Sequence, residues 1–123
     1  MLGAIAGDII GSVYEQNNIR TKDFPLFSRN SSFTDNTIMT LAIADCIMQR
    51  GDFAQYLRAY GRRYPDTEYG SMFKKWLLSD IAPTYGSLGN GAAIRVNPEA
   101  YVGRNVKEVR ILAGRTAIGS HNH

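Results

Sequence analysis

The stretch FTDNTIMTLA, residues 33–42, decides how the rest of the chain is interpreted. It places a hydroxyl, a carboxylate and a carboxamide on Thr34, Asp35 and Asn36, where periodic apolar residues begin. Threonine and aspartate are favoured at helix N-termini, so these residues predict an ordinary helix cap. Their oxygens are also the kind of ligand that a hard cation such as Mg²⁺ prefers. The stretch alone leaves both interpretations open.

Apolar residues recur at helical spacing on both sides of this stretch. A helix over 35–49 is predicted to end at Arg50-Gly51, with an inward face made of Met39, Ala42, Ile43, Cys46 and Ile47. Further helices are predicted over residues 2–14, between Asp52 and Pro65, across 72–77, over 92–96 with a stop at Asn97-Pro98, and from Asn105 to Gly119. No segment alternates over enough residues to predict a strand. The sequence therefore predicts an all-α fold.

Three of these helices carry more detailed expectations. The segment across 72–77 is expected to bury Met72, Phe73, Trp76 and Leu77. Asn105 and Glu108 have the spacing of a capping box, and the helix that they open carries the stripe Val106, Val109, Ala113 and Ala117. Near the N-terminus, Gly3, Gly7 and Gly11 lie four residues apart. Since each glycine costs up to about 1 kcal/mol in a helix, this stripe predicts that another helix or a ligand approaches closely.

Size and composition fit one globular domain over residues 1–123. Hydrophobic residues make up 44% of the chain and charged residues 20%, which gives no support for disorder. The net charge is only +3, and the basic residues are scattered among acidic ones. A protein that follows a nucleic-acid backbone is expected to carry a basic stripe, so we expect no nucleic-acid partner.

Cysteine usage and hydropathy bear on the compartment. Cys46 is the only cysteine and cannot form an intramolecular disulfide, so nothing indicates an oxidising environment. The apolar N-terminal segment 1–11 contains Asp8, lacks a basic leader and is too short to span a bilayer. We therefore expect a soluble, cytoplasmic protein with no membrane partner.

Three further clusters could carry chemistry. Glu15 follows the glycine-striped helix and precedes a long polar loop over 16–33, so it is either a general acid or base or a solvated surface residue. The loop GSLGNG, residues 86–91, precedes a predicted helix and offers backbone N–H groups to an anion such as a diphosphate. It lacks a Walker lysine, and no strand precedes it. The ending SHNH, residues 120–123, is either a metal-binding tail or a frayed end.

Taken in order, these motifs resemble one family. The segments at 7–15, 33–40, 69–76, 86–98 and 120–123 are similar to those of the ADP-ribosylglycohydrolases, which include dinitrogenase-reductase-activating glycohydrolase and the ADP-ribosyl-acceptor hydrolases. The resemblance covers essentially the whole chain. It implies an all-α bundle that holds two Mg²⁺ or Mn²⁺ ions and hydrolyses the bond at ribose C1″ that links ADP-ribose to a protein or small molecule.

The resemblance also implies roles for individual residues. Glu15 matches a glutamate beside the scissile linkage, and His121 matches a histidine that lines the substrate cleft. Thr34, Asp35 and Asn36 match the first metal-ligand motif, which is normally Thr-Asp-Asp. The residues that match the loop holding the diphosphate and ribose are Ser87, Gly89, Asn90 and Gly91.

Two departures from the family pattern shape the functional expectation. Asn36 stands where the family has aspartate, and the later Asp-x-Asp-Thr segment that supplies the remaining metal ligands is absent. We therefore expect the N-terminal part of the family bundle, weak or no metal binding, and no activity of this chain alone. Uncovered apolar helix faces are expected to make it a homo-oligomer. The alternatives are a non-catalytic module that binds ADP-ribose or another nucleotide, and a self-associating helical remnant.

Overall fold

The structure is a computed structural model and describes residues 1–118 and 120–121. Its elements in chain order are α1 (Leu2–Gly11), the 3₁₀ helix η1 (Ser12–Tyr14), α2 (Asp35–Gln49), α3 (Phe53–Arg63), α4 (Ser71–Leu78), α5 (Gly91–Arg95), the 3₁₀ helix η2 (Asn97–Tyr101) and α6 (Val106–Ile118). The described residues contain no strand, so the predicted all-α fold class is confirmed.

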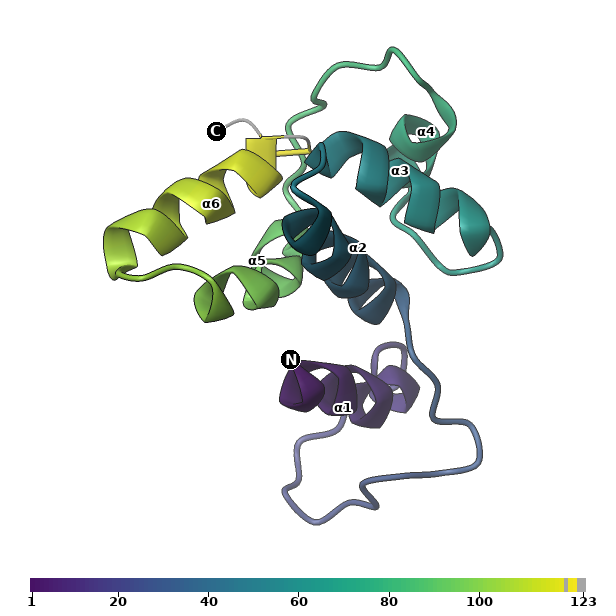
Figure 1. The fold of residues 1–123 in the computed structure, drawn as a ribbon. Coiled ribbons are helices and arrows are strands. Elements are labelled where there is room, and N and C mark those ends of the chain that lie inside the picture. The colour runs from purple at the N-terminus through teal and green to yellow at the C-terminus, as the bar shows by residue number, and fades with distance from the viewer. Residues whose placement is uncertain (119, 122–123) are drawn as a thin grey trace.

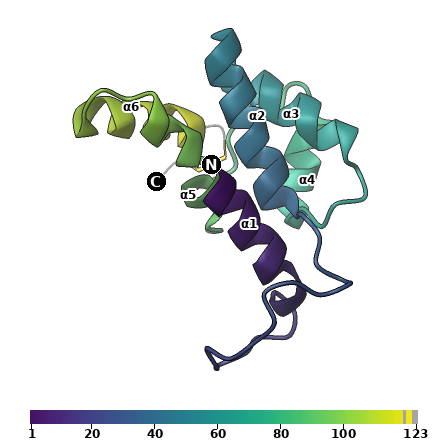
Figure 2. The ribbon, with the colours of Figure 1, turned by 60° about the horizontal axis from the view of Figure 1, so that its bottom comes forward.

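Helix α2 is the centre of the fold. It lies between the α3–α4 pair and the arm formed by α5 and α6, with α1 to one side (Figures 1 and 2). Its predicted bounds are confirmed, and Arg50, the C-cap residue that follows it, adopts a left-handed conformation with φ of 54°. The amide of Gly51 donates to the carbonyl of Cys46 at 3.0 Å, which satisfies one of the last carbonyls of the helix.

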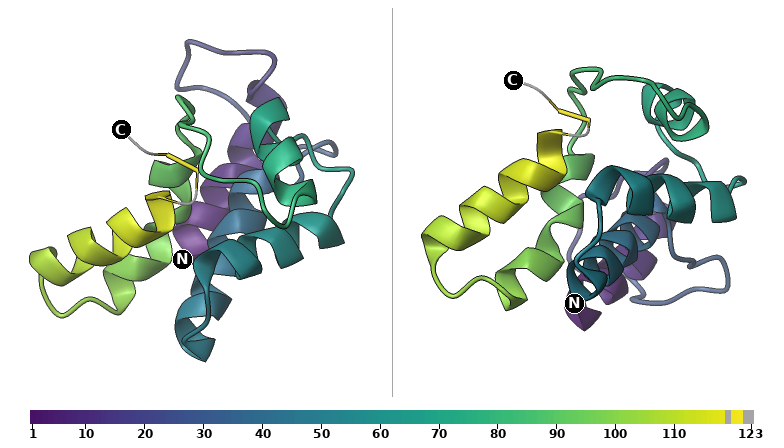
Figure 3. Two further views of the ribbon diagram at one scale, coloured as in Figure 1. Left: turned by 90° about the horizontal axis from the view of Figure 1, so that it is seen from above. Right: turned by 45° about the horizontal axis from the view of Figure 1, so that its top comes forward.

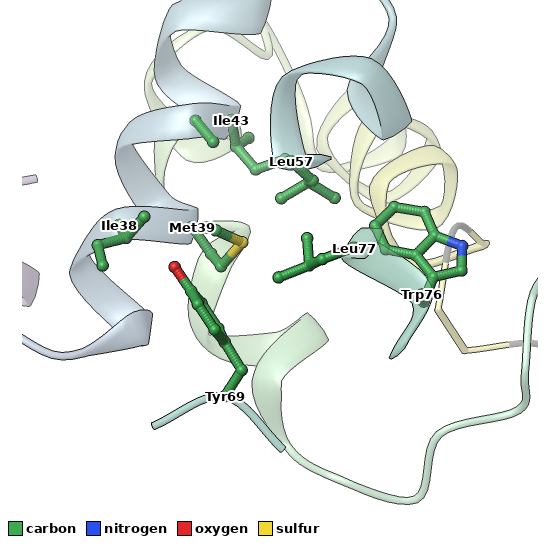
Figure 4. Packing of buried hydrophobic residues seen from close by; sticks show 8 residues of the cluster. Ile38, Met39, Ile43, Leu57, Tyr69, Trp76 and Leu77 are labelled. Atoms are coloured by element: carbon green, nitrogen blue, oxygen red, sulfur yellow. The ribbon is translucent and has the colours of Figure 1, made fainter. Parts of the chain in front are cut away.

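The hydrophobic core lies on the α3–α4 side of α2. Figure 4 shows side chains from α2, α3 and α4 pointing toward one another, together with Tyr69 from the segment before α4. The buried cluster consists of Ile38, Met39, Ala42, Ile43, Leu57, Tyr69, Trp76 and Leu77. Burying apolar side chains of this size stabilises a fold by roughly 1.5–3 kcal/mol each relative to leaving them exposed. The face predicted for α2 is therefore the face that builds the core.

Helix α3 begins as predicted. The side chain of Asp52 accepts a hydrogen bond from the Gln55 amide at 2.9 Å, and the helix ends two residues before Pro65. The predicted capping box of α6 is half present. The Asn105 side chain accepts from the Glu108 amide at 3.0 Å, but the Glu108 carboxylate accepts from the Arg104 amide instead of returning to Asn105.

Two packing predictions were wrong. Met72 is 53% exposed because Phe73, Trp76 and Leu77 already form the inward face of the short helix α4. Val106 is 77% exposed because it opens α6 at the end that extends away from the rest of the molecule (Figure 1). A Cβ built on Gly3, Gly7 or Gly11 would meet no atom within 4 Å, so no described segment packs on the glycine stripe, and the close approach of a ligand to it stays a prediction.

One boundary differs from the prediction. The α-helix expected over 2–14 ends at Gly11 and continues as η1. The helix expected over 92–96 does stop before Asn97-Pro98, since α5 ends at Arg95, and the chain then forms η2, where the fixed φ of Pro98 suits the first turn of a helix. Pro98 and Glu99 are both buried in η2. None of the helices that the structure describes is long and apolar enough to cross a bilayer.

Candidate functional site

The start of α2 is held by a carboxylate from α1. Asp8 Oδ2 accepts hydrogen bonds from the Thr34 amide at 2.8 Å, the Thr37 amide at 3.2 Å and the Thr37 hydroxyl at 2.6 Å. Asp8 Oδ1 accepts from the Thr34 hydroxyl at 2.5 Å. Free N–H groups and the helix dipole make a helix N-terminus favourable for an anion. Asp8 therefore serves as a second cap, a role that the sequence did not reveal.

Thr34 is the N-cap residue that the sequence predicted. Its hydroxyl oxygen accepts from the Asn36 amide at 3.2 Å while donating to Asp8. Asp35 opens the helix and is half-buried, and Asn36 follows it. The cap interpretation is thus confirmed for Thr34, whereas Asp35 and Asn36 line open space beside the helix end.

That open space is a cavity of about 270 Å³, which we call the glycine-loop cleft. It is lined by Glu15, Asp35, Asn36, Met39, Glu68, Gly70, Phe73, Tyr85, Ser87, Gly89, Asn90, Gly91, Arg95 and His121. Every site residue predicted from the sequence lines it except Thr34. Thr34 lines a neighbouring cavity of about 500 Å³, which shares Glu15, Asp35 and Glu68 with the glycine-loop cleft. Residues up to 106 positions apart in the chain therefore meet around one cavity.

The carboxylates around the cleft make it electronegative. The pKa of Glu15 is raised, first by partial burial and then by the negative charges of Asp35, Asp8 and Glu68. Burial also raises the pKa of Asp35, with a further contribution from Asp8, while hydrogen bonds from Asn36 and Thr34 act in the opposite direction. A cation bound among these groups would offset their mutual repulsion.

The residues fit a single hard cation better than two. No group of three His, Cys, Asp or Glu side chains suited to a metal ion occurs among residues 1–118 and 120–121. Asp35 contributes one carboxylate, Asn36 one amide oxygen and Thr34 a hydroxyl that is already engaged with Asp8. Mg²⁺ commonly keeps several waters and takes only one or two carboxylates from a protein. The donors present could therefore contact one hard cation.

The glycine loop is partly occupied by its own hydrogen bonds. Gly86 has a positive φ of 62°, which suits glycine. The Ser87 amide donates to the Ser120 carbonyl at 2.8 Å, and the Gly89 amide donates to the Ser87 hydroxyl at 3.1 Å. The loop therefore offers an anion fewer free N–H groups than the sequence predicted.

His121 contacts the glycine loop directly. Its Nε2 atom lies 2.7 Å from the Gly89 carbonyl oxygen and its Nδ1 atom lies 2.7 Å from the Ser120 hydroxyl. Figure 3 shows the end of the described chain, in yellow, beside the green loop that precedes α5. His121 therefore lines the cleft as predicted, but both ring nitrogens have partners in the protein, which does not support a metal-binding tail at this residue. Asn122 and His123 lie outside the described residues.

Sequence reasoning missed three polar residues of the cleft wall. Glu68 contributes a carboxylate, and Tyr85 and Arg95 flank the glycine loop. Glu68 directly precedes the segment at 69–76 that was used for the family resemblance, so its position was a usable signal. Arg95 lies within the segment at 86–98, but nothing in the sequence indicated that its side chain would be only 3% exposed.

Comparison with known proteins identifies the family. The model of the ADP-ribosylglycohydrolase family matches residues 1–123. The chain belongs to the ADP-ribosylglycohydrolase family. It is also similar to the ADP-ribosylhydrolase ARH3 of Xenopus tropicalis, at 30% identity over an alignment that covers 78% of this chain. The same alignment covers 36% of the Xenopus protein, so this ADP-ribosylglycohydrolase homologue spans about a third of the length of that relative.

Proposed function

We propose that the glycine-loop cleft binds ADP-ribose, free or attached to a protein. The observation that carries this proposal is the meeting of Glu15, Asp35 and the loop 87–91 around one cavity of about 270 Å³. Backbone N–H groups of a glycine loop can bind a diphosphate, and carboxylates can accept hydrogen bonds from the hydroxyls of a ribose. Family membership and the name of the Xenopus relative support the same ligand class.

Each part of the cleft has a role in this proposal. The amides of Asn90 and Gly91 contact the diphosphate, because those of Ser87 and Gly89 already have partners. Glu15 lies beside the C1″ linkage, where its raised pKa suits a group that exchanges a proton. Asp35 and Asn36, with Thr34 at their side, hold a Mg²⁺ or Mn²⁺ ion. Such an ion would supply positive charge to the ligand's oxygens.

We also propose that this chain by itself does not hydrolyse its ligand. Asn36 gives the metal motif one negative charge fewer than the Thr-Asp-Asp pattern, and the described residues contain no group of three acidic, His or Cys ligands. An ion held by one carboxylate exchanges readily with water. The function is then binding of ADP-ribose without turnover, which is also the main alternative that the sequence suggested.

Calorimetric titration of the full chain with ADP-ribose, with and without Mg²⁺, tests the binding proposal. We expect binding that Mg²⁺ strengthens, and Asp35→Ala should remove the Mg²⁺-dependent part. Asp80→Ala is the matched control, because Asp80 is an exposed carboxylate paired with Arg62 away from the cleft. Absence of any binding would contradict the proposal. Mg²⁺-dependent release of ADP-ribose from a modified protein, abolished in Asp35→Ala, would contradict the absence of turnover.

The exposed apolar helix faces support self-association, which we propose as the state of this chain in solution. Leu2 is 84% exposed and Val106 is 77% exposed, so both leave apolar surface in water. Light scattering over a wide concentration range should detect dimers or larger species, and Val106→Glu should weaken them. Ile81→Glu is the control, because Ile81 is 93% exposed but lies in a loop. A monomer at all concentrations would contradict the proposal.

We propose a cytoplasmic location as well. Cys46 is buried and has no disulfide partner, which fits a reducing compartment. Fractionation of cells that express a tagged chain tests this, and recovery in a membrane or secreted fraction would contradict it.

A further inference from the structure

Arg95 is the most deeply buried cation that the structure describes, and the proposed binding role does not use its charge. Its side chain is 3% exposed, although arginine is almost never fully buried unless it is paired. Its Nη2 atom donates to the Thr116 carbonyl at 2.8 Å and to the Ser120 hydroxyl at 2.6 Å. Both partners come from the C-terminal part of the chain, so Arg95 ties the end of α5 to the residues that follow α6.

The hydrogen bonds continue from Ser120 to the glycine loop. Arginine nitrogens only donate, so the Ser120 hydroxyl oxygen accepts from Arg95 and its own proton is directed to another acceptor. His121 Nδ1 lies 2.7 Å from that oxygen. At the other side of the ring, Nε2 lies 2.7 Å from the Gly89 carbonyl, and a carbonyl oxygen only accepts. The partners therefore assign neutral His121 as the tautomer that carries its proton on Nε2.

This arrangement fixes the glycine loop at two points. The Ser120 carbonyl accepts from the Ser87 amide at 2.8 Å, and the His121 ring donates to the Gly89 carbonyl. The Gly89 carbonyl carries partial negative charge and would repel a bound phosphate if it had no donor. Its hydrogen bond to His121 gives it a donor within the protein and limits how the loop can turn. Ser120 is fully buried, so water cannot replace Arg95 as the donor to its hydroxyl unless the structure opens locally.

We propose that Arg95 is a positioning residue for the glycine-loop cleft: by donating to Ser120 it directs the Ser120 hydroxyl proton toward Nδ1 of His121, and the Nε2–H form of His121 that results donates to the Gly89 carbonyl and fixes the conformation of the loop. This inference rests on the proposed function only for its effect on ADP-ribose. The tautomer and the loop conformation are properties of the free protein. Arg95 touches no ligand in this scheme, and His121 acts by holding the loop and not by transferring a proton.

The first test measures the tautomer in the unmodified chain. Long-range proton–nitrogen NMR spectra of the ¹⁵N-labelled full chain at pH above 7.5 distinguish an imidazole protonated on Nε2 from one protonated on Nδ1. The chain has two histidines, and His121→Gln removes the imidazole signals of His121. The signals that disappear are thereby assigned to His121. We expect the Nε2–H pattern for His121. A signal from the Nδ1–H tautomer, or from an even mixture of the two, in the unmodified chain overturns the proposal.

The second test removes the Ser120 hydroxyl, which lies between Arg95 and His121. Ser120→Ala removes the hydroxyl but leaves the bond from Arg95 to the Thr116 carbonyl. We expect the His121 pattern to shift toward a mixture of tautomers and the Gly89 and Ser87 amide signals to move. Ser79→Ala is the matched control, since the Ser79 hydroxyl accepts from the Ala82 amide and neither residue lines the cleft. Unchanged His121 nitrogen shifts in a folded Ser120→Ala protein overturn the proposal.

The third test measures whether the Ser120 hydroxyl affects the affinity for ADP-ribose. Titration with ADP-ribose should give about three- to tenfold weaker binding in Ser120→Ala than in the parent chain, the effect of about one hydrogen bond. Equal affinity in the two proteins would overturn the positioning role. If the parent chain does not bind ADP-ribose at all, the proposed function fails, while the tautomer and amide signals still decide whether Arg95 orders the loop.

Discussion

Helices α1 and α2 lie next to each other but are held in the fold by different forces. Most residues of α2 from Thr37 to Cys46 are buried, and its apolar face forms the core. Helix α1 has no buried residue, although its residues are on average the more hydrophobic. What connects α1 to α2 is the Asp8 carboxylate, which accepts four hydrogen bonds from the first turn of α2. Hydrophobic composition therefore does not tell which helix is buried. A shared polar contact, placed at a helix end, can dock a helix that contributes little to the core.

The largest effect should come from the core of α2. Ile43 has no exposed surface, so Ile43→Ala removes buried methyl groups and leaves a cavity. We expect a loss of about 2–5 kcal/mol in the free energy of unfolding, measured by urea denaturation. The matched variant in α1 is Ile10→Ala, at a half-buried position, which should lose clearly less. Equal losses would mean that α1 contributes to the core as α2 does.

Removal of the Asp8 carboxylate should have the next largest effect. Asp8→Ala leaves the amides of Thr34 and Thr37 without their partner, and we expect a loss of about 1–3 kcal/mol. Because these bonds dock α1, amide hydrogen exchange over residues 2–11 should accelerate more than exchange in α3. Asp23→Ala changes an exposed loop carboxylate and serves as control. Unchanged exchange in α1 would show that the helix is held by something other than Asp8.

The buried carboxylate of Glu99 should make the stability of the fold depend on pH. Glu99 has no exposed surface, neither of its carboxylate oxygens has a hydrogen-bond donor among the described residues, and burial raises its pKa above the usual 4.5. The Thr116 hydroxyl, which lies near this carboxylate, donates its proton to Ala113 instead. Between the usual and the raised pKa the folded state binds more protons than the unfolded state, so stability falls as pH rises through that window.

Denaturation curves recorded from pH 4 to pH 8 measure this effect. The parent chain should become less stable as Glu99 ionises, and Glu99→Gln should flatten that part of the profile because its amide does not titrate. Glu108→Gln, at a surface carboxylate near Arg104, is the control. A profile of Glu99→Gln that runs parallel to the parent over the whole range would contradict the role of Glu99.

The smallest effects are expected from alanine substitutions of Gly7 in α1 and Gly61 in α3. A Cβ on Gly7 would meet no atom within 4 Å, so Gly7→Ala should stabilise α1 by about 0.5–1 kcal/mol through helix propensity alone. A Cβ on Gly61 would lie 2.6 Å from a methyl carbon of Leu77, so Gly61→Ala should destabilise the chain. Thermal denaturation of the two variants compares them directly. Loss of stability in Gly7→Ala would indicate a partner packed on the glycine stripe.

The sequence patterns predicted the positions of the helices better than they predicted the contacts between them. The bounds of α2 and the Asp52 cap of α3 could be predicted because spacing and capping are local properties of a few consecutive residues. The exposure of Met72 and Val106 could not, because it depends on how far a neighbouring helix extends. The candidate site followed the same division. Motif order predicted which residues line the glycine-loop cleft, but Glu68 and Arg95 belong to it only because the chain folds back on itself.

The sequence by itself determined the helical class, the family and the identity of the residues at the start of α2. These depend on residue types and on their order, which the sequence states directly. Only the tertiary structure decided that Asp8 caps α2 from another helix, that Arg95 donates to Ser120 and that His121 contacts the Gly89 carbonyl. Hydrogen bonds between residues 25 or more positions apart depend on distances and directions that the packing of whole helices sets, and no local pattern encodes them.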